Sequence, residues 1–262
     1  MVQKIKTKMK ITFLGTGTSQ GIPIIACDCH VCKSNNSKDK RLRVSVLIEF
    51  DGKTIVVDTG PDFRTQMLRE NVQNLDAVLF THEHKDHVAG MDDVRPFCFK
   101  HNKEIEIYAE KRVLEALKKE FHYVFDDKFD YPGIPKINPN EITNKSFSIL
   151  GKTIVPIRGF HYKLPVFGYR IDNFTYITDM NRIDEEELNK VKGTEILVIN
   201  ALQKKEHISH FTLDEALEII KKINPKKAYL THMSHILGKH EDISEELPEN
   251  VFLAYDGLKI KI

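Results

Sequence analysis

One short run of residues constrains this chain more than any other feature. Residues 81–87 read Thr-His-Glu-His-Lys-Asp-His, so three histidines and one aspartate fall within six positions. Imidazole nitrogens and carboxylate oxygens are ligands that Zn²⁺, Mn²⁺ and Fe²⁺ accept in proteins. The apolar segment 76–81 predicts a buried strand that ends at this run. We therefore expect a metal site at the end of a strand.

The spacing within the run indicates more than one metal. His82 and His84 are two positions apart, so they can point to the same side of an extended segment. Asp86 and His87 come from the turn into the next helix. The run can therefore contact two adjacent metals, but it supplies too few ligands to saturate both.

Further ligand candidates follow apolar strands later in the chain. They are His161, Asp179 and His232. The C-terminal ends of strands are where α/β proteins assemble their sites. Each residue alone is a weak indication, but together with the run they place ligand-type residues at four strand ends.

Strand and helix patterns alternate along the chain in two similar halves. The predicted strands are 10–15, 43–50, 54–58, 76–81, 105–109, 147–149, 153–157, 167–171, 175–178, 195–200 and 227–231, with a last strand pair near the C-terminus. The predicted helices are 63–71, 111–120, 184–191 and one that begins after Thr212, where Glu215 completes a capping box. Two sheet-rich halves with helices predict an α/β fold, the αββα four-layer sandwich. Because no linker composition interrupts them, we expect residues 1–262 to form a single domain.

Charge and hydropathy exclude several classes of function. The 39 basic and 38 acidic side chains give a net charge of +1, so no global field favours a nucleic-acid partner. The basic stretches 4–10 and 38–43 are interpreted as solvated faces. No apolar run reaches the roughly 18 residues of a membrane span, and the N-terminus lacks the apolar stretch of a signal peptide. We expect a cytoplasmic protein without a membrane partner.

A cluster of cysteines predicts a second metal site. Cys27, Cys29 and Cys32 lie within six positions, which favours metal over disulfides in a cytosolic protein. Tetrahedral Zn²⁺ needs a fourth ligand, for which His30 is one candidate. Cys98 lies in an apolar stretch and is interpreted as a packed thiol.

Taken together, these residues resemble the metallo-β-lactamase superfamily over the whole chain. Within it, four segments are similar to PhnP-type phosphodiesterases, which act beside carbon–phosphorus lyase on ribosyl cyclic phosphates. The segments are Gly-Thr-Gly-Thr-Ser-Gln-Gly-Ile-Pro at 15–23, the cysteine cluster, Leu-Pro-Val-Phe-Gly-Tyr-Arg at 164–170, and Thr-His-Met-Ser-His at 231–235.

The resemblance implies a role for each ligand candidate. The first metal would be bound by His82, His84 and His161, the second by Asp86, His87 and His232, and Asp179 would bridge them. Two divalent ions (Mn, Zn or Fe) roughly 3.5–4 Å apart suit in-line displacement at phosphorus, with a metal-bridging hydroxide as the nucleophile.

Two further histidines take their roles from the resemblance. His210 stands where the subgroup has its catalytic histidine, so we expect it, beside the ligand Asp86, to serve in catalysis as general acid or transition-state stabiliser. His207 is the runner-up. His235 stands where the subgroup has the fourth ligand of its structural zinc, and we prefer it to His30.

The expected function is a metal-dependent phosphodiesterase for small, including cyclic ribosyl, phosphodiesters. One alternative is tRNA 3′ processing, as in the ribonuclease Z group, although the sequence has no inserted basic arm. Hydrolysis of a thioester or lactam and a non-enzymatic metal-binding module are the others. A homodimer is plausible by analogy. The segment 121–145, rich in aromatics and prolines, is interpreted as an ordered connection, a flap over the site or a dimer contact.

Overall fold

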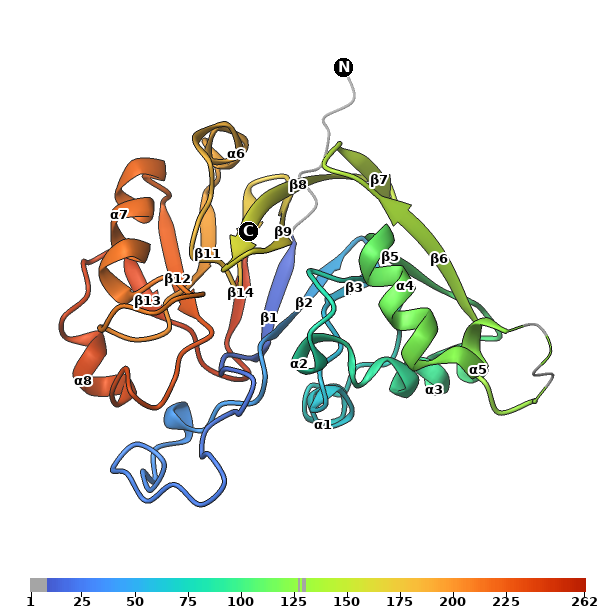
Figure 1. Ribbon diagram of the computed structural model, residues 1–262, viewed down its shortest axis with the longest axis horizontal. Coiled ribbons are helices and arrows are strands. Elements are labelled where there is room, and N and C mark those ends of the chain that lie inside the picture. Colours follow the sequence, from blue (N-terminus) through green and yellow to red (C-terminus); the bar gives the residue numbers. More distant parts are fainter. Residues whose placement is uncertain (1–8, 127, 129–130) are drawn as a thin grey trace.

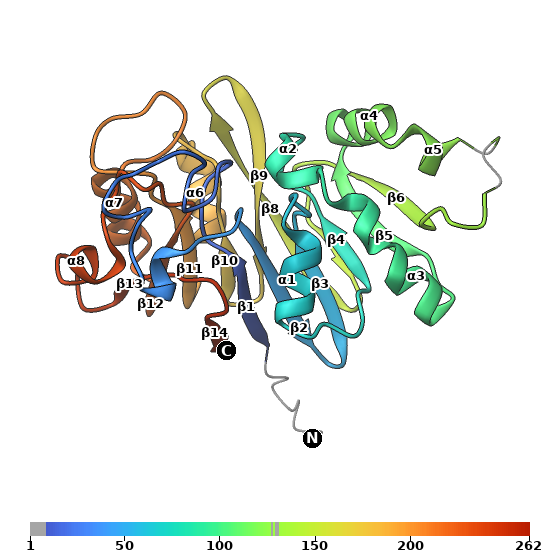
Figure 2. The same cartoon turned by 90° about the horizontal axis from the view of Figure 1, so that it is seen from below.

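The computed structural model describes residues 9–126, 128 and 131–262. Two seven-stranded sheets stack face to face, and helices cover their outer faces (Figures 1 and 2). This is the αββα four-layer sandwich that the alternation of strand and helix patterns predicts.

The N-terminal half, together with the C-terminal strand β14, builds the first sheet, and it also supplies the helices that pack on it. In spatial order the strands are β14 (Lys259–Lys261), β1 (Lys10–Gly15), β2 (Ser45–Phe50), β3 (Lys53–Val57), β4 (Ala77–Leu79), β5 (Ile105–Glu110) and β6 (Ile137–Ile142). The α-helices of this half are α1 (Phe63–Arg69), α2 (Lys85–Val88), α3 (Arg95–His101), α4 (Lys111–Glu120) and α5 (His122–Phe125). Two 3₁₀ turns, η1 (Ser37–Asp39) and η2 (Met91–Val94), lie in the connections.

The second half repeats the plan. Its strands in spatial order are β13 (Val251–Leu253), β12 (Lys227–Thr231), β11 (Ile196–Asn200), β10 (Phe174–Tyr176), β9 (Leu164–Ile171), β8 (Lys152–His161) and β7 (Phe147–Ile149). Its helices are α6 (Glu185–Val191), α7 (Leu213–Ile223) and α8 (His240–Ser244). Helix α7 begins with the expected Thr212–Glu215 capping box and ends at Asn224, whose φ of 51° is left-handed.

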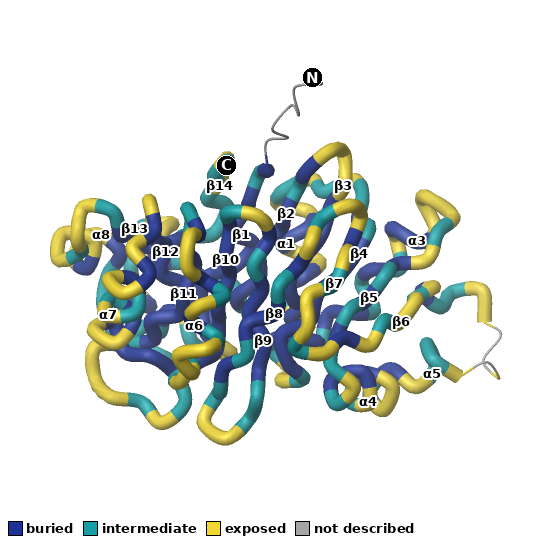
Figure 3. Tube along the Cα trace, turned by 90° about the horizontal axis from the view of Figure 1, so that it is seen from above, coloured by how far each residue is buried: buried dark blue, intermediate teal, exposed yellow. Residues whose placement is uncertain are grey.

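Three apolar clusters hold the layers together. One lies between the sheets and includes Phe13, Ile48 and Tyr176. The others join each sheet to its own helices, and Figure 3 shows that most of the buried chain follows the strands. The rigid sheets therefore fix the positions of the loops at their ends.

The structure corrects several expectations about secondary structure. The last two strands do not pair with each other, because β13 joins the second sheet beside β12 and β14 joins the first beside β1. Strand β8 continues to His161, four residues beyond the end of the predicted strand 153–157. The segment 121–145 contains α5 and β6, and β6 carries Pro139 because it is an edge strand, where a missing N–H is tolerated. Residues 127, 129 and 130 of that segment lie outside the described residues.

One basic stretch is not a solvated face throughout. Arg41 is buried, and its guanidinium donates hydrogen bonds to Thr16 Oγ1 at 2.8 Å and to the carbonyl of Ala254 at 2.7 Å. These bonds tie the N-terminal loop to the C-terminal part of the chain. Of the stretch 4–10, residues 4–8 lie outside the described part. No helix in the described ranges has the length and apolar character that crossing a membrane requires.

Candidate metal centre and active site

The loop after β4 begins the site. His82 is fully buried directly beyond the strand, whereas His84 is exposed and precedes helix α2. Asp86 and His87 lie on α2, as the sequence predicts. His87 is fully buried because the helix packs this side chain inward.

His161, at the end of β8, faces the first two histidines of this run. The ring centroids of His82 and His84 are 4.6 Å apart, those of His84 and His161 5.1 Å, and those of His82 and His161 5.8 Å. The carbonyl of Ser209 lies 2.8 Å from Nδ1 of His161, so this nitrogen donates a hydrogen bond there and the ring is fixed in orientation. The three rings thus converge as the resemblance implies for one metal.

Asp179, just after β10, lies at the centre of the site. Its Oδ2 is 3.3 Å from Nε2 of His87 and 3.0 Å from Nδ1 of His232. Its Oδ1 is 3.8 Å from Nδ1 of His210. Asp86 adds a second carboxylate, with Oδ2 3.3 Å from Nε2 of His87. One buried carboxylate therefore faces histidines on both of its oxygens.

The donor atoms fit divalent cations. Among the described residues, three buried ring nitrogens have no hydrogen-bond partner: His82 Nε2, His87 Nε2 and His210 Nδ1. An unpartnered buried polar atom is costly, so several converging in one place indicate a site built to bind something. Nitrogen and carboxylate donors are what Zn²⁺, Mn²⁺ and Fe²⁺ require.

The groups of donor atoms that lie closest together in the structure differ from the two ligand sets that the resemblance implies. One group with donor atoms within 4.8 Å of one another contains His82, His87 and Asp179. The other contains His161, Asp179 and His210. Asp179 belongs to both, which agrees with a bridging role, but His210 stands as close to the carboxylate as a ligand would. His207 lies further out, with its ring centroid 5.2 Å from that of His210.

Burial and neighbouring charges set the protonation of these groups. Burial alone would raise the pKa of Asp179, but His232 and His87 hold it well below its usual value. Burial opposes protonation of His87, yet Asp179, Asp86 and Asp58 outweigh it and raise the pKa of His87 well above its usual value. Burial lowers the pKa of His82 strongly and that of His161 as well. The centre thus contains ionised carboxylate whose charge attracts cations.

Asp58, just after β3, is a site residue that the sequence reasoning missed. Its Oδ2 lies 2.7 Å from Nδ1 of His87 and accepts a hydrogen bond from Thr81 Oγ1 at 2.8 Å. Asp58 is fully buried and has φ of 65°, while Asp179 and His232 have φ of 56° and 53°. Left-handed backbone is costly outside glycine and clusters at functional sites. An aspartate directly after an apolar strand was the available signal.

Replacing Asp58 by asparagine is expected to weaken metal binding about 10–100-fold, the range for a carboxylate that orients a ligating histidine. The amide keeps the bond from the Thr81 backbone but no longer balances the charge at His87 Nδ1. Competition with a coloured chelator measures the affinity. Asp76→Asn is the matched control, because Asp76 bonds Lys103 and Thr54 elsewhere. Equal affinities for wild type and Asp58→Asn would contradict the orienting role.

The cysteine cluster is assembled as expected, with His235 as its fourth member. Nδ1 of His235 lies 3.3 Å from Sγ of Cys27, 3.3 Å from Sγ of Cys29 and 3.5 Å from Sγ of Cys32. Tetrahedral zinc with ordinary Zn–S and Zn–N bonds places such atoms about 3.6 Å apart. His30 is exposed and outside the group. The four donors therefore fit a closed zinc site that fastens the N-terminal loop to the loop after β12.

Cys27→Ser is expected to remove one zinc per chain and lower the free energy of unfolding by several kcal/mol, because a structural zinc contributes directly to folding. Elemental analysis and thermal unfolding measure the two effects. Cys98→Ser is the control for zinc content, since this buried thiol packs in α3 outside the cluster, as predicted. An unaltered zinc count in Cys27→Ser would remove the proposed site.

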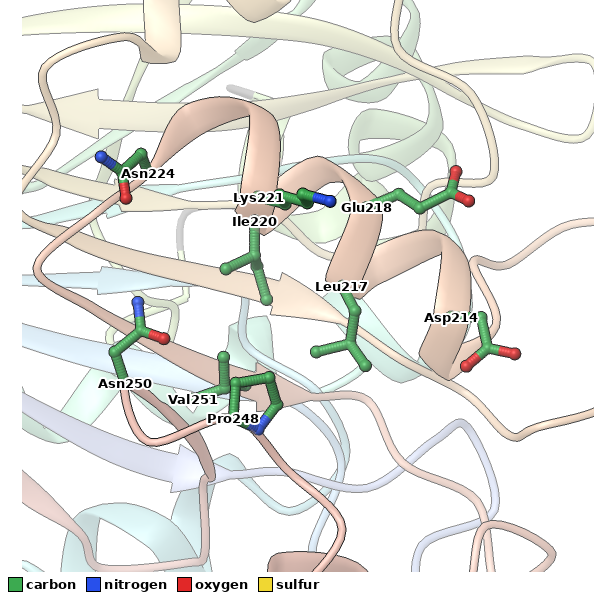
Figure 4. Close-up of a pocket in the computed structure, with 9 residues that line it drawn as sticks. All are labelled: Asp214, Leu217, Glu218, Ile220, Lys221, Asn224, Pro248, Asn250 and Val251. Atoms are coloured by element: carbon green, nitrogen blue, oxygen red, sulfur yellow. The ribbon is translucent and has the colours of Figure 1, made fainter.

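A hollow of about 490 Å³ lies elsewhere, between α7 and the segment that leads into β13. Figure 4 shows Leu217 and Ile220 of α7 pointing toward Pro248 and Val251. Its lining contains no histidine or cysteine. The metal-type chemistry therefore belongs to the strand-end site and not to this hollow.

Comparisons with known proteins agree with this geometry. Residues 53–233 match the family model described as beta-lactamase superfamily domain. The crystal structure of a diphosphatase from the PhnP family superposes with a TM-score of 0.91 at 37% identity, covering 97% of each chain. A Porphyromonas gingivalis protein named octanoyltransferase is 42% identical over 254 residues, which are 96% of this chain and 51% of that protein.

Ribonuclease Z of Metallosphaera sedula is a more distant relative, 24% identical over 199 residues, or 74% of this chain and 58% of that protein. The chain thus spans about half the length of the Porphyromonas protein and somewhat more of the ribonuclease. The matched residues include Asp58 and all the candidate ligands from His82 to His232. The chain belongs to the metallo-β-lactamase superfamily and, within it, to the PhnP family.

Proposed function

We propose that this protein is a dinuclear metal-dependent phosphodiesterase that hydrolyses small phosphodiesters, cyclic ribosyl phosphates among them. The observation that carries the proposal is the position of Asp179, whose two oxygens face His87 and His232 on one side and His210 on the other. A carboxylate so placed suits two cations at the spacing that phosphoryl transfer uses. We also propose zinc at the cysteine cluster.

The site residues have distinct roles in the proposed reaction. His82, His84, His161, Asp86, His87, His232 and the bridging Asp179 would hold two divalent ions (Mn, Zn or Fe). Bound there, the ions would neutralise charge on the phosphate and activate water for attack. Asp58 holds the His87 ring in orientation, and the Ser209 carbonyl does the same for His161.

His210 is positioned to assist the leaving oxygen. It is buried beside Asp179, and its ring lies 4.5 Å from the ring of His161 and 4.7 Å from that of His232. Burial first, and then His232, lowers the pKa of His210 to about 2, so the ring is neutral. A neutral ring donates a hydrogen bond from one nitrogen, which favours the transition-state stabiliser over the charged general acid.

A diphosphate is the second candidate substrate class. It is favoured by the 37% identical PhnP-family relative, which is described as a diphosphatase. Hydrolysis of a diphosphate also displaces an oxygen from phosphorus, so the same site could serve it. The weaker likeness to ribonuclease Z and the octanoyltransferase name of the Porphyromonas protein make pre-tRNA and an octanoyl thioester useful comparison substrates.

A substrate panel tests the proposal with metal-loaded protein. We expect hydrolysis of bis(p-nitrophenyl) phosphate and of 2′,3′-cyclic AMP, with p-nitrophenyl phosphate slower and pre-tRNA intact. Cleavage of pre-tRNA alone, with a steep salt dependence, would instead assign the protein to tRNA processing. Hydrolysis of the thioester alone would assign it to acyl chemistry, and no turnover of any substrate would support a metal-binding module.

A further inference from the structure

A hollow of about 510 Å³ adjoins the candidate metal centre. His84 and His161 form its inner side, and the rest comes from the turn between β8 and β9 with the first residue of β9, and from the loop that precedes His210. The first contributes residues 162–164 and the second contributes Ile208 and Ser209. Because the hollow begins at two expected ligands, a group attached to a phosphate at the centre would extend into it.

The two walls are tied together by hydrogen bonds. Asn181 accepts one from the backbone N–H of Tyr162 at 2.9 Å and donates one from Nδ2 to the carbonyl of Ile208 at 2.9 Å. The His161 ring bonds the carbonyl of Ser209 from the other side. The hollow is therefore preformed and does not depend on a ligand to assemble it.

Tyr162 is an unusual residue for its position. It is the first of two residues in the turn between β8 and β9, where His161 pairs with Leu164, and its φ is 58°. Glycine is usual where such turns require positive φ. The residue is 50% exposed, so packing does not account for an aromatic side chain here. A strained, exposed aromatic beside a candidate active site indicates a role for the ring itself.

The chemistry of the other lining residues limits the class of ligand that the hollow can bind. Ile208 is 66% exposed and adds an apolar surface. Lys163 places its ammonium 5.2 Å from the centroid of the Tyr162 ring. A cation beside an aromatic and an apolar surface suits a planar base attached to an anionic phosphate. A simple acyl chain would offer no group that complements the lysine charge.

We propose that this hollow binds a nucleobase, so that the substrate class is a nucleotide-derived phosphodiester or diphosphate whose base stacks on Tyr162. The proposal rests on the proposed function, because the phosphate must lie at the metal centre. Stacking on an aromatic tolerates any base, so the hollow selects for a base without reading its identity.

Calorimetric titration with AMP and with ribose 5-phosphate tests this on the metal-containing protein, since ribose 5-phosphate has a hydroxyl where AMP carries the base. We expect AMP to bind about tenfold tighter, within the range of base–aromatic stacking. Tyr162→Gly should lower the affinity for AMP to the affinity for ribose 5-phosphate. The affinity for ribose 5-phosphate itself should stay unchanged. Glycine suits the positive φ, so this variant should fold. Tyr162→Phe should retain the preference.

Tyr131→Gly is the matched control, because it removes a ring that is 70% exposed and does not line the hollow. Equal binding of AMP and ribose 5-phosphate to wild type, or equal weakening of both in Tyr162→Gly, would overturn the base site. So would octyl phosphate binding more tightly than AMP, which would assign the hollow to an acyl chain. Hydrolysis of bis(p-nitrophenyl) phosphate by the same preparations reports separately on the proposed function.

Discussion

Replacing Asp179 by asparagine is expected to lower phosphodiester hydrolysis about a thousandfold or more, which corresponds to the several kcal/mol that a bridged metal pair contributes. Asparagine keeps the shape but removes the charge. In the wild type, His232 and His87 hold the pKa of Asp179 far below its usual value despite its burial, so the carboxylate is always ionised at working pH. Its loss removes the anion that two cations would share.

Steady-state kinetics and elemental analysis measure the effect. The variant should bind fewer active-site metals per chain, while the zinc of the cysteine cluster is retained. Asp184→Asn is the matched control, because this exposed aspartate precedes α6 without capping it. Unchanged turnover and full metal content in Asp179→Asn would show that this carboxylate does not bridge metals.

His210→Ala is expected to retain both active-site metals and to lose turnover by roughly 10²–10³-fold, the range for a hydrogen-bond donor that stabilises the transition state. The reason is position: Nδ1 of His210 has no hydrogen-bond partner and lies 3.8 Å from Asp179 Oδ1, next to the centre but not within bonding distance of the carboxylate. We infer that a group placed there would contact the reacting oxygens of a substrate bound at the centre.

Metal content distinguishes this role from ligation. If His210 is a ligand, as its grouping with His161 and Asp179 would allow, the alanine variant loses a metal as well as activity. His207→Ala is the comparison variant, since His207 is half-buried and further from Asp179. A larger loss of turnover in His207→Ala than in His210→Ala would reverse the assignment between the two histidines.

Much of the site could be predicted because its chemistry is concentrated in local sequence. The composition of the run 81–87 alone predicts a metal site, and each of the later candidate ligands follows an apolar strand. The zinc cluster was harder, because His30 and His235 are equally plausible by residue type. The resemblance favours His235, and the fold agrees with it by bringing residues some two hundred positions apart to within 3.5 Å.

What the sequence could not provide depends on tertiary context. In the sequence, Asp58 does not stand out from the other aspartates. Its role depends on the parallel pairing of β3 and β4, which places it against Thr81 and His87. Strand β6 carries a proline, and only its edge position makes that acceptable. Tyr162 and Ile208 belong to no motif. That they line one hollow is apparent only in the fold, where Asn181 forms hydrogen bonds with both of their loops.

The proposed function requires two metals at the Asp179 site for phosphodiester hydrolysis. Its most direct test adds Mn²⁺ to chelator-treated protein while hydrolysis of bis(p-nitrophenyl) phosphate and bound metal are measured together. We expect no hydrolysis without added metal and a maximal rate when two ions per chain are bound beyond the zinc of the cysteine cluster. Hydrolysis by the metal-free protein, or a maximal rate with a single added ion, would contradict it.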